Sequence, residues 1–227
     1  MTLWRHHSAT IANTRGYGNQ DAYGFNTDTF VVADGVSRSV DPAAAAQAVV
    51  KTTLGLSGAA SKRWGNEVLI AADIAAEDAD GLTTITGLRF VSEDEAGARL
   101  IVFQVGDSML LRVRGRKVER VTAMHSYVEG LVKAGYITRA QAKRHPQNNV
   151  IVSCCGRMED KQVRSITARS TDALVLCTDG VHGLLEAEDI LRCLQAEDPA
   201  KALCEAGQAA GSSDDATAIV LFGPRWA

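Results

Sequence analysis

Val31-Val32-Ala33-Asp34-Gly35 is the stretch that says most about how this chain folds. Apolar, β-branched residues that end in Asp-Gly are typical of a buried strand that carries a carboxylate into a turn. Three other segments also place Asp at or beside the end of an apolar run: Val105-Gly106-Asp107-Ser108, Leu176-Cys177-Thr178-Asp179-Gly180 and Asp214-Asp215-Ala216-Thr217. The sequence therefore predicts several buried strands with carboxylates at their ends.

These carboxylates also predict a kind of chemistry. Several ionised carboxylates repel one another strongly in a dry site unless cations neutralise them. Ligands that are all oxygen atoms favour hard divalent ions, Mg²⁺ or Mn²⁺, over zinc or copper. If the strand ends meet, a divalent-cation site is expected there.

Composition narrows the class of protein. The 227 residues carry 24 Lys and Arg against 27 Asp and Glu, for a net charge of −3. This balance gives no electrostatic reason to expect nucleic-acid binding. No apolar run is long enough to span a membrane, and the N-terminus lacks the apolar region of a signal peptide. Five cysteines without a Cys-x-x-Cys pair favour a reducing, cytoplasmic location.

Local patterns predict a mixed order of elements. A hairpin is expected over 25–33, and Asp41-Pro42 is typical of the start of a helix. Helices are predicted at 41–56, 66–79, 128–134, 138–144, 187–195 and 199–210. Strands are predicted at 83–91, 99–105, 109–114, 117–121, 150–153, 173–178 and 216–222. Clusters of strands separated by pairs of helices favour packed antiparallel sheets over a doubly wound parallel sheet.

In their order and spacing, the motifs resemble those of a known family. The set is Asn19-Gln20-Asp21, Asp34-Gly35, Thr83-Thr84, Gly106-Asp107-Ser108, His125-Ser126, Asp179-Gly180 and Asp214-Asp215-Ala216-Thr217. It resembles the metal-dependent Ser/Thr protein phosphatases of the protein phosphatase 2C family, especially compact bacterial members, from about Asn13 to Phe222. The resemblance implies an α+β fold, a four-layer α-β-β-α sandwich with two central antiparallel sheets. It also implies one phosphatase-like domain over 1–227, with a flap segment at about 125–156.

The resemblance implies a two-metal site. Asp34 would bridge two Mn²⁺ or Mg²⁺ ions, and the carbonyl of Gly35 would bind one of them. Asp179 and Asp214 would complete the site, and Asp107 would reach a weak third ion.

Other residues would support this site. Asp21 would order water at the metals. Arg15 is a candidate for gripping the substrate phosphate, although it lies one residue from the usual position and simple surface exposure is an equal alternative. Asp215 stands where the family often has Asn, and would either hydrogen-bond locally or serve as a substitute ligand. His125 is expected to be structural or solvated, with a role as metal ligand or acid as the alternative. His182 is expected to contact substrate or solvent rather than a metal.

Several positions depart from the family pattern. Gln20 replaces a Glu, and Ser37-Arg38 replaces a Gly-Gly pair, which adds Arg38 as a second candidate for phosphate contact. Val36 stands where animal members have a His proposed as general acid. Gly183 replaces an Asp that often helps to hold the third ion, so affinity for that ion should be low.

The resemblance implies hydrolysis of phospho-Ser/Thr in proteins by a hydroxide that bridges the metals, reversing a cellular Ser/Thr kinase. The expected partners are phosphoprotein substrates and that kinase, with no nucleic acid and no membrane. One alternative is a catalytically weak or dead phosphatase-like module that binds a partner. Another is a hydrolase of similar fold that acts on small phosphomonoesters.

Overall fold

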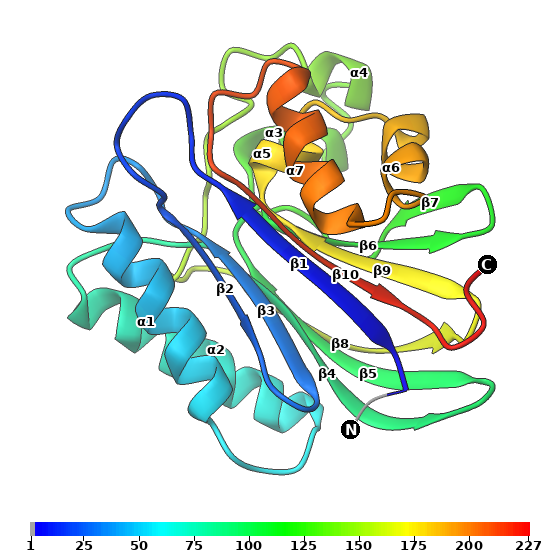
Figure 1. Cartoon of the computed structure of the whole chain (residues 1–227). Helices are drawn as coiled ribbons and strands as arrows, with labels where there is room; N and C mark the ends of the chain where they lie inside the picture. The colour runs from blue at the N-terminus through cyan, green and yellow to red at the C-terminus, as the bar shows by residue number, and fades with distance from the viewer. Residues whose placement is uncertain (1–2) are drawn as a thin grey trace.

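The computed structural model describes residues 3–227, and two antiparallel sheets of five strands each form its centre (Figure 1). The first sheet contains, in spatial order, β1 (Arg5–Ile11), β10 (Ala216–Phe222), β9 (Asp172–Cys177), β6 (Met109–Arg114) and β7 (Lys117–Arg120). The second contains β2 (Asp21–Phe25), β3 (Thr29–Asp34), β4 (Ile85–Asp94), β5 (Gly97–Val105) and β8 (Gln162–Arg169).

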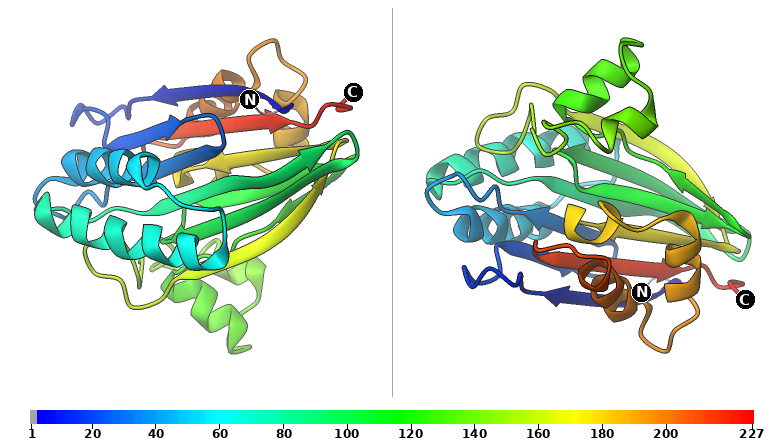
Figure 2. Two further views of the ribbon diagram at one scale, coloured as in Figure 1. Left: turned by 90° about the horizontal axis from the view of Figure 1, so that it is seen from below. Right: turned by 90° about the horizontal axis from the view of Figure 1, so that it is seen from above.

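Helices cover the outer face of each sheet (Figure 2). The second sheet is covered by α1 (Pro42–Gly55) and α2 (Lys62–Asp78). The first is covered by α5 (Asp179–His182), α6 (Ala187–Cys193) and α7 (Pro199–Ala209). Two short helices, α3 (Tyr127–Lys133) and α4 (Arg139–Ala142), lie in the flap segment, residues 125–156, and stand apart from these layers. The predicted α+β sandwich with two antiparallel sheets is confirmed.

Three apolar cores hold the layers together. Single strands contribute to two of them, because successive side chains point to opposite faces of the sheet. In β10, Ile219 and Leu221 belong to the core between the sheets, whereas Ala218 and Val220 belong to the core under α7. All four side chains are fully buried. Because successive side chains of a strand point to opposite faces, one apolar strand supplies two cores. Burial of each large aliphatic side chain stabilises the fold by about 1.5–3 kcal/mol.

Capping residues fix where the long helices begin. Asp41 Oδ1 accepts a hydrogen bond from Ala44 N at 2.9 Å, and Pro42 is the first helical residue, as predicted. The second helix begins at Lys62, four residues before the predicted start. The reason is Ser61, whose Oγ accepts a hydrogen bond from Trp64 N at 3.1 Å and caps the first turn.

Other sequence predictions differ from the structure. The strand predicted at 150–153 is wrong: Ile151 forms only an isolated bridge to Ser126, while Val150 and Val152 are exposed. Strands β1 and β8 were not predicted. Both are edge strands with mostly polar or half-exposed residues, so their sequences lack strict apolar alternation.

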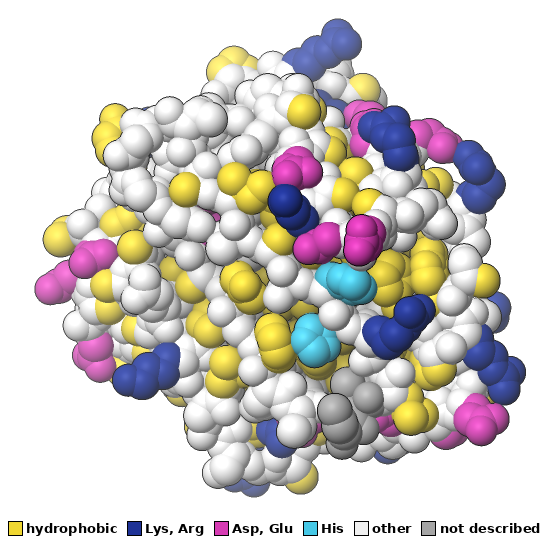
Figure 3. All heavy atoms as spheres, in the orientation of Figure 1, with side chains coloured by type: hydrophobic (Ala, Val, Ile, Leu, Met, Phe, Trp, Pro, Cys, Tyr) yellow, Lys and Arg dark blue, Asp and Glu magenta, His cyan; other side chains and the backbone are white. Residues whose placement is uncertain are grey.

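Figure 3 shows Lys and Arg side chains scattered around one face rather than gathered into a patch. Within residues 3–227, no helix combines the length and apolar character needed to cross a membrane.

Candidate active site

Five aspartates from both sheets form an acid cluster, which we define as Asp21, Asp34, Asp107, Asp179 and Asp214. Strand pairing places Asp21, which begins β2, directly opposite Asp34, which ends β3. Asp34 interacts electrostatically with the other four carboxylates. The structure thus brings together carboxylates that are widely separated in the sequence.

Burial and mutual repulsion make four of the five carboxylates, Asp21, Asp34, Asp107 and Asp179, hard to ionise. Burial, followed by neighbouring carboxylates, raises the pKa of both Asp34 and Asp179 well above the usual range. Burial also raises the pKa of Asp21 to about 7 and that of Asp107 to about 6. Positive charge placed among them would reverse these shifts, because it favours the ionised form.

Threonines fix the backbone on either side of Asp34. Asp34 N donates to Thr84 Oγ1 at 3.0 Å, and Thr83 Oγ1 donates to Asp34 O at 2.9 Å. Thr84 Oγ1 also lies 2.7 Å from Ser108 Oγ, which follows Asp107. The Thr-Thr pair therefore connects the end of β3 to the turn between β5 and β6.

A second hydroxyl network links Asp21 to the other sheet. Thr178 Oγ1 donates to Asp21 Oδ2 at 2.9 Å, and Thr217 N donates to Thr178 Oγ1 at 3.0 Å. Thr10 Oγ1 lies 2.7 Å from Thr217 Oγ1. Sequence reasoning assigned these threonines no role. The sequence signal for two of them was that Thr178 and Thr217 belong to the aspartate motifs.

Two neutral histidines hold the turn that carries Asp107. Gly106 N donates to His125 Nδ1 at 3.1 Å, and His125 N donates to Gly106 O at 2.8 Å. His182 Nε2 lies 3.1 Å from Asp107 O, which is an acceptor, so Nε2 is the donor. Burial lowers the pKa of both rings, that of His182 to about 4. Both therefore have structural partners at the turn.

Asp215 accepts hydrogen bonds from a loop that is distant in the sequence, and its alternative role as a substitute metal ligand stays a prediction. Its Oδ1 accepts from Asn13 N at 2.6 Å and from Asn13 Nδ2 at 2.8 Å. Its Oδ2 accepts from Gln20 N at 2.8 Å. Asp215 thus fixes the loop over 13–20, which carries Arg15.

That loop places Arg15 beside the acid cluster. The Arg15 Nε and Nη2 atoms donate to Ser213 Oγ at 3.1 and 2.6 Å, and Ser213 directly precedes Asp214.

Two residues that depart from the family pattern also contact each other, because Ser37 Oγ donates to Gln20 Oε1 at 2.8 Å. Arg38 is exposed. Phosphate contact by either arginine stays a prediction.

Gly35 occupies a position where a side chain does not fit. A Cβ atom there would come within 2.5 Å of Pro42 O and 2.7 Å of Gln20 O, both of them backbone atoms. Gly35 N also donates to Gln20 O at 3.1 Å, which ties the motif of Asp34 to that of Asp21. Metal binding by the Gly35 carbonyl stays a prediction.

The donor set fits hard divalent cations. Asp21 Oδ1 and Asp107 Oδ1 are buried and have no hydrogen-bond partner within residues 3–227. In the same residues, no group of three or more His, Cys, Asp or Glu side chains is arranged to hold an ion by itself. Mg²⁺ does not require such a group, because it keeps several waters and binds through one or two carboxylates.

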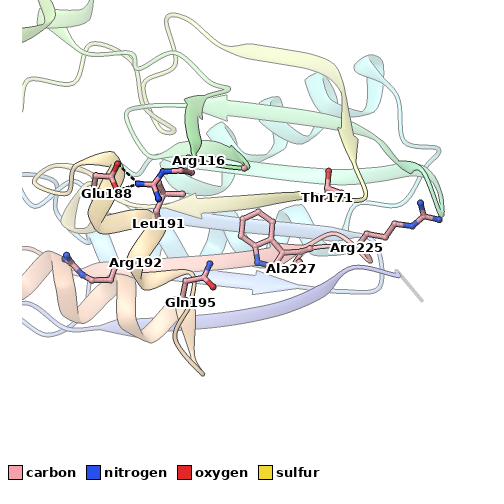
Figure 4. A pocket seen from close by; sticks show the side chains of 10 residues that line it. Arg116, Thr171, Glu188, Leu191, Arg192, Gln195, Arg225 and Ala227 are labelled. Carbon is pink, nitrogen blue, oxygen red and sulfur yellow. Dashed lines mark hydrogen bonds and ion pairs between the residues drawn. The ribbon is translucent and has the colours of Figure 1, made fainter.

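Another pocket lies away from the acid cluster (Figure 4). It has a volume of about 740 Å³ and is lined by Arg116, Arg192 and Arg225 among others, but by no member of the acid cluster. Each of these arginines already has an acidic partner: Glu188, Asp189 and Glu95, respectively. A smaller pocket of about 320 Å³ is lined in part by Asp107 and Asp179 and adjoins the candidate site.

Comparison with known proteins identifies relatives of one kind. The chain is 31% identical over 166 residues to the serine/threonine protein phosphatase PstP of Mycobacterium tuberculosis, which covers 71% of this chain but 31% of PstP. The chain therefore spans about a third of that relative's length. No family model matches the sequence.

Solved structures agree with this relationship. The PPM Ser-Thr phosphatase MsPP of Mycobacterium smegmatis, solved in complex with cacodylate, has 27% identity and a TM-score of 0.84, covering 96% of this chain and 97% of its own. The catalytic domain of PstP, solved in complex with two manganese ions, shares the fold at 22% identity and a TM-score of 0.82, covering 96% and 97%. With the ordered aspartate motifs and the two-sheet sandwich, these findings show that the chain belongs to the bacterial metal-dependent Ser/Thr protein phosphatases of the protein phosphatase 2C family.

Proposed function

We propose that this chain removes phosphate from phosphoserine and phosphothreonine in proteins, with two Mn²⁺ or Mg²⁺ ions as cofactors. The acid cluster is the observation that carries the proposal. None of its five carboxylates forms an ion pair with Lys, Arg or His in the part of the chain that the structure describes. Buried carboxylates are normally paired with cationic side chains or coordinate metals.

We assign the ligands as the family motif does. Asp34 would contact both ions, with the Gly35 carbonyl, Asp179 and Asp214 completing the site. Bound there, the ions would lower the pKa of a water towards neutrality and offset negative charge on the phosphoryl group. Asp107 would serve a weaker third ion, since Gly183 supplies no second carboxylate.

Other residues would orient the reactants. Thr178 fixes Asp21 through Oδ2, which leaves the buried Oδ1 to accept a hydrogen bond from water. The Arg15 guanidinium would bind two phosphate oxygens, because its planar fork matches their geometry. Phosphoproteins would be the substrates, and a Ser/Thr kinase of the same cell would supply them.

The test is hydrolysis of p-nitrophenyl phosphate and phosphopeptides with Mn²⁺, Mg²⁺ or EDTA. We expect turnover that depends on metal and is lost in Asp34→Ala and Asp179→Ala. Glu67→Ala, on the exposed face of α2, is the control and should keep full activity. Absence of turnover in a protein that still binds Mn²⁺ would favour a phosphatase-like binding module instead.

Substitution of Arg15 and Arg38 tests the grip on phosphate. If Arg15 contacts phosphate, Arg15→Ala should lower kcat/KM by about 1.5–3 kcal/mol of transition-state stabilisation. Arg38→Ala is the matched comparison, because both side chains are exposed near the acid cluster motifs. Unchanged kcat/KM in both variants would contradict the assignment.

A further inference from the structure

The smaller pocket, which we call the side pocket, lies between the flap segment and helices α5 and α6, above β6 and β7. Its volume of about 320 Å³ is at the low end for ligand sites, which suits one side chain better than a cofactor. Two members of the acid cluster, Asp107 and Asp179, line it. A segment whose phosphate lay at the acid cluster would therefore reach this pocket with a neighbouring residue.

The floor and walls of the side pocket are largely apolar. They are formed by Met109, Leu111, Val118, Val128, Leu185 and Ile190. Five of these six residues, all except Val118, are buried, although they border the open space of the pocket. Such a concave apolar surface binds a large aliphatic or aromatic side chain by removing it from water.

One wall adds excess positive charge. Arg139 forms two hydrogen bonds of 3.1 Å with Glu129, and Arg120 approaches the same carboxylate at 3.5 Å. Two guanidinium groups thus share one carboxylate, whose side chain is only 8% exposed. The remaining cation at this wall, Lys143, is paired with Glu186. These side chains together carry one net positive charge, which opposes the negative charge of Asp107 and Asp179 in the same pocket and favours an anion over a cation beside the arginines.

Gly183 borders the side pocket as bare backbone. A Cβ atom at this position would lie 2.7 Å from Asp179 O, so a side chain would require the backbone of the acid cluster to shift. Gly183 supplies no carboxylate for a third ion. It also leaves the boundary between the acid cluster and the side pocket without a side chain.

We propose that the side pocket binds a large apolar side chain of the phosphoprotein substrate, within about three residues of the phosphorylated one, beside an acidic residue. This rests on the proposed function and defines its substrate class: phosphopeptides with an apolar and acidic flank. Its basis is the apolar lining, the unbalanced arginine pair and the continuity with Asp107 and Asp179.

The experiment compares phosphopeptides that differ at one position. Leu replaces Ser at each of the three positions on either side of the phosphoserine, and Asp or Lys is then placed next to the preferred Leu. We expect kcat/KM to rise about 10- to 100-fold for Leu at one position, the range that burial of one large apolar side chain supports. Asp should then be preferred over Lys.

Two substitutions in α4 provide the matched variants. Ala142 lines the side pocket, whereas Ala140 is exposed on the same helix and does not. Ala142→Phe should fill the pocket and abolish the preference for Leu, while Ala140→Phe keeps it. Arg139→Gln should remove the preference for Asp over Lys. All three variants should hydrolyse p-nitrophenyl phosphate at the unaltered rate, because that substrate has no flanking residues.

The outcomes separate the two proposals. No turnover of p-nitrophenyl phosphate by the unaltered protein with Mn²⁺ would overturn the proposed function itself. Turnover of that substrate with equal kcat/KM for the Leu and Ser peptides at every position would overturn the side pocket alone. A Leu preference that survives Ala142→Phe would also overturn it.

Discussion

Asp215 is 3% exposed, and its two oxygens accept three hydrogen bonds from the loop that carries Arg15. Both carboxylate oxygens thus hold the loop in place. The two neighbouring aspartates therefore have different roles. Asp214 belongs to the acid cluster, whereas Asp215 positions a loop.

Removal of the Asp215 carboxylate should loosen this loop. Asp215→Ala removes the acceptor of the half-buried backbone N–H groups of Asn13 and Gln20, so we expect the free energy of unfolding to fall by about 1–3 kcal/mol. The kcat/KM should also fall, because Arg15 is held less firmly. Urea denaturation and steady-state kinetics measure these effects. Asp215→Asn keeps one acceptor oxygen and should lose less, and equal stability of both variants and the unaltered protein would refute this account.

The flap segment illustrates how one element is attached to the acid cluster. Its first residue, His125, exchanges hydrogen bonds with both backbone groups of Gly106, and its carbonyl accepts from Val152 N at 2.9 Å. The ring is 5% exposed, so these bonds are not replaced by water if they break. The flap is therefore fixed at its base, beside the turn of Asp107.

Loss of the His125 ring nitrogen should release the flap without unfolding the sheets. His125→Phe leaves Gly106 N without an acceptor, at a cost of about 1–3 kcal/mol. Amides of residues 126–152 should then exchange faster with solvent, while those of β10 keep their protection. Hydrogen exchange followed by mass spectrometry measures this. His145→Phe, at a half-exposed flap position, is the control, and faster exchange in it alone would contradict the role of His125.

Elements with a local signal were predictable from the sequence, whereas those defined by distant partners were not. Asp41-Pro42 predicts the start of α1, because the Asp41 cap and Pro42 at the first helical position act within a single turn. Val150-Ile151-Val152 has high strand propensity but lies on the flap, where no strand pairs with it beyond one bridge. The β8 strand has a polar outer side, so its sequence does not predict a strand. Its extended conformation depends on its pairing with β5.

The same distinction holds for the site. Aspartates at strand ends were visible, because Asp-Gly after an apolar run is a local pattern. The contact of Thr178 with Asp21 joins residues 157 positions apart, so no local pattern could show it. The bond between Gln20 and Ser37 was also hidden, although both had been noted singly as departures.

For the whole molecule, the acid cluster predicts an unusual dependence of stability on pH. Burial, chiefly, raises the pKa of Asp21 from 3.8 to about 7 in the folded metal-free protein. The folded state then binds this proton more tightly than the unfolded state. Its contribution, on the order of 4 kcal/mol, is present below about pH 4 and is lost as the pH rises through about 7.

Thermal unfolding tests this dependence. In EDTA, Tm should fall between pH 4 and 7, and Asp21→Asn should flatten the curve because its amide does not titrate. Mn²⁺ should raise Tm at pH 7, since an ion at 100 times its Kd adds about 2.7 kcal/mol per site. A flat Tm in EDTA, or no effect of Mn²⁺, would contradict this description of the cluster.

The pairing of β1 with β10 affects how the chain folds during its synthesis on the ribosome. These strands lie near opposite ends of the sequence but side by side in one sheet, from Arg5 opposite Phe222 to Ile11 opposite Ala216. A nascent chain therefore leaves the edge of β1 that pairs with β10 without its partner until β10 has been synthesised. The first sheet cannot close before β10 has left the ribosome, so chaperones that shield strand edges should matter for the yield of this protein.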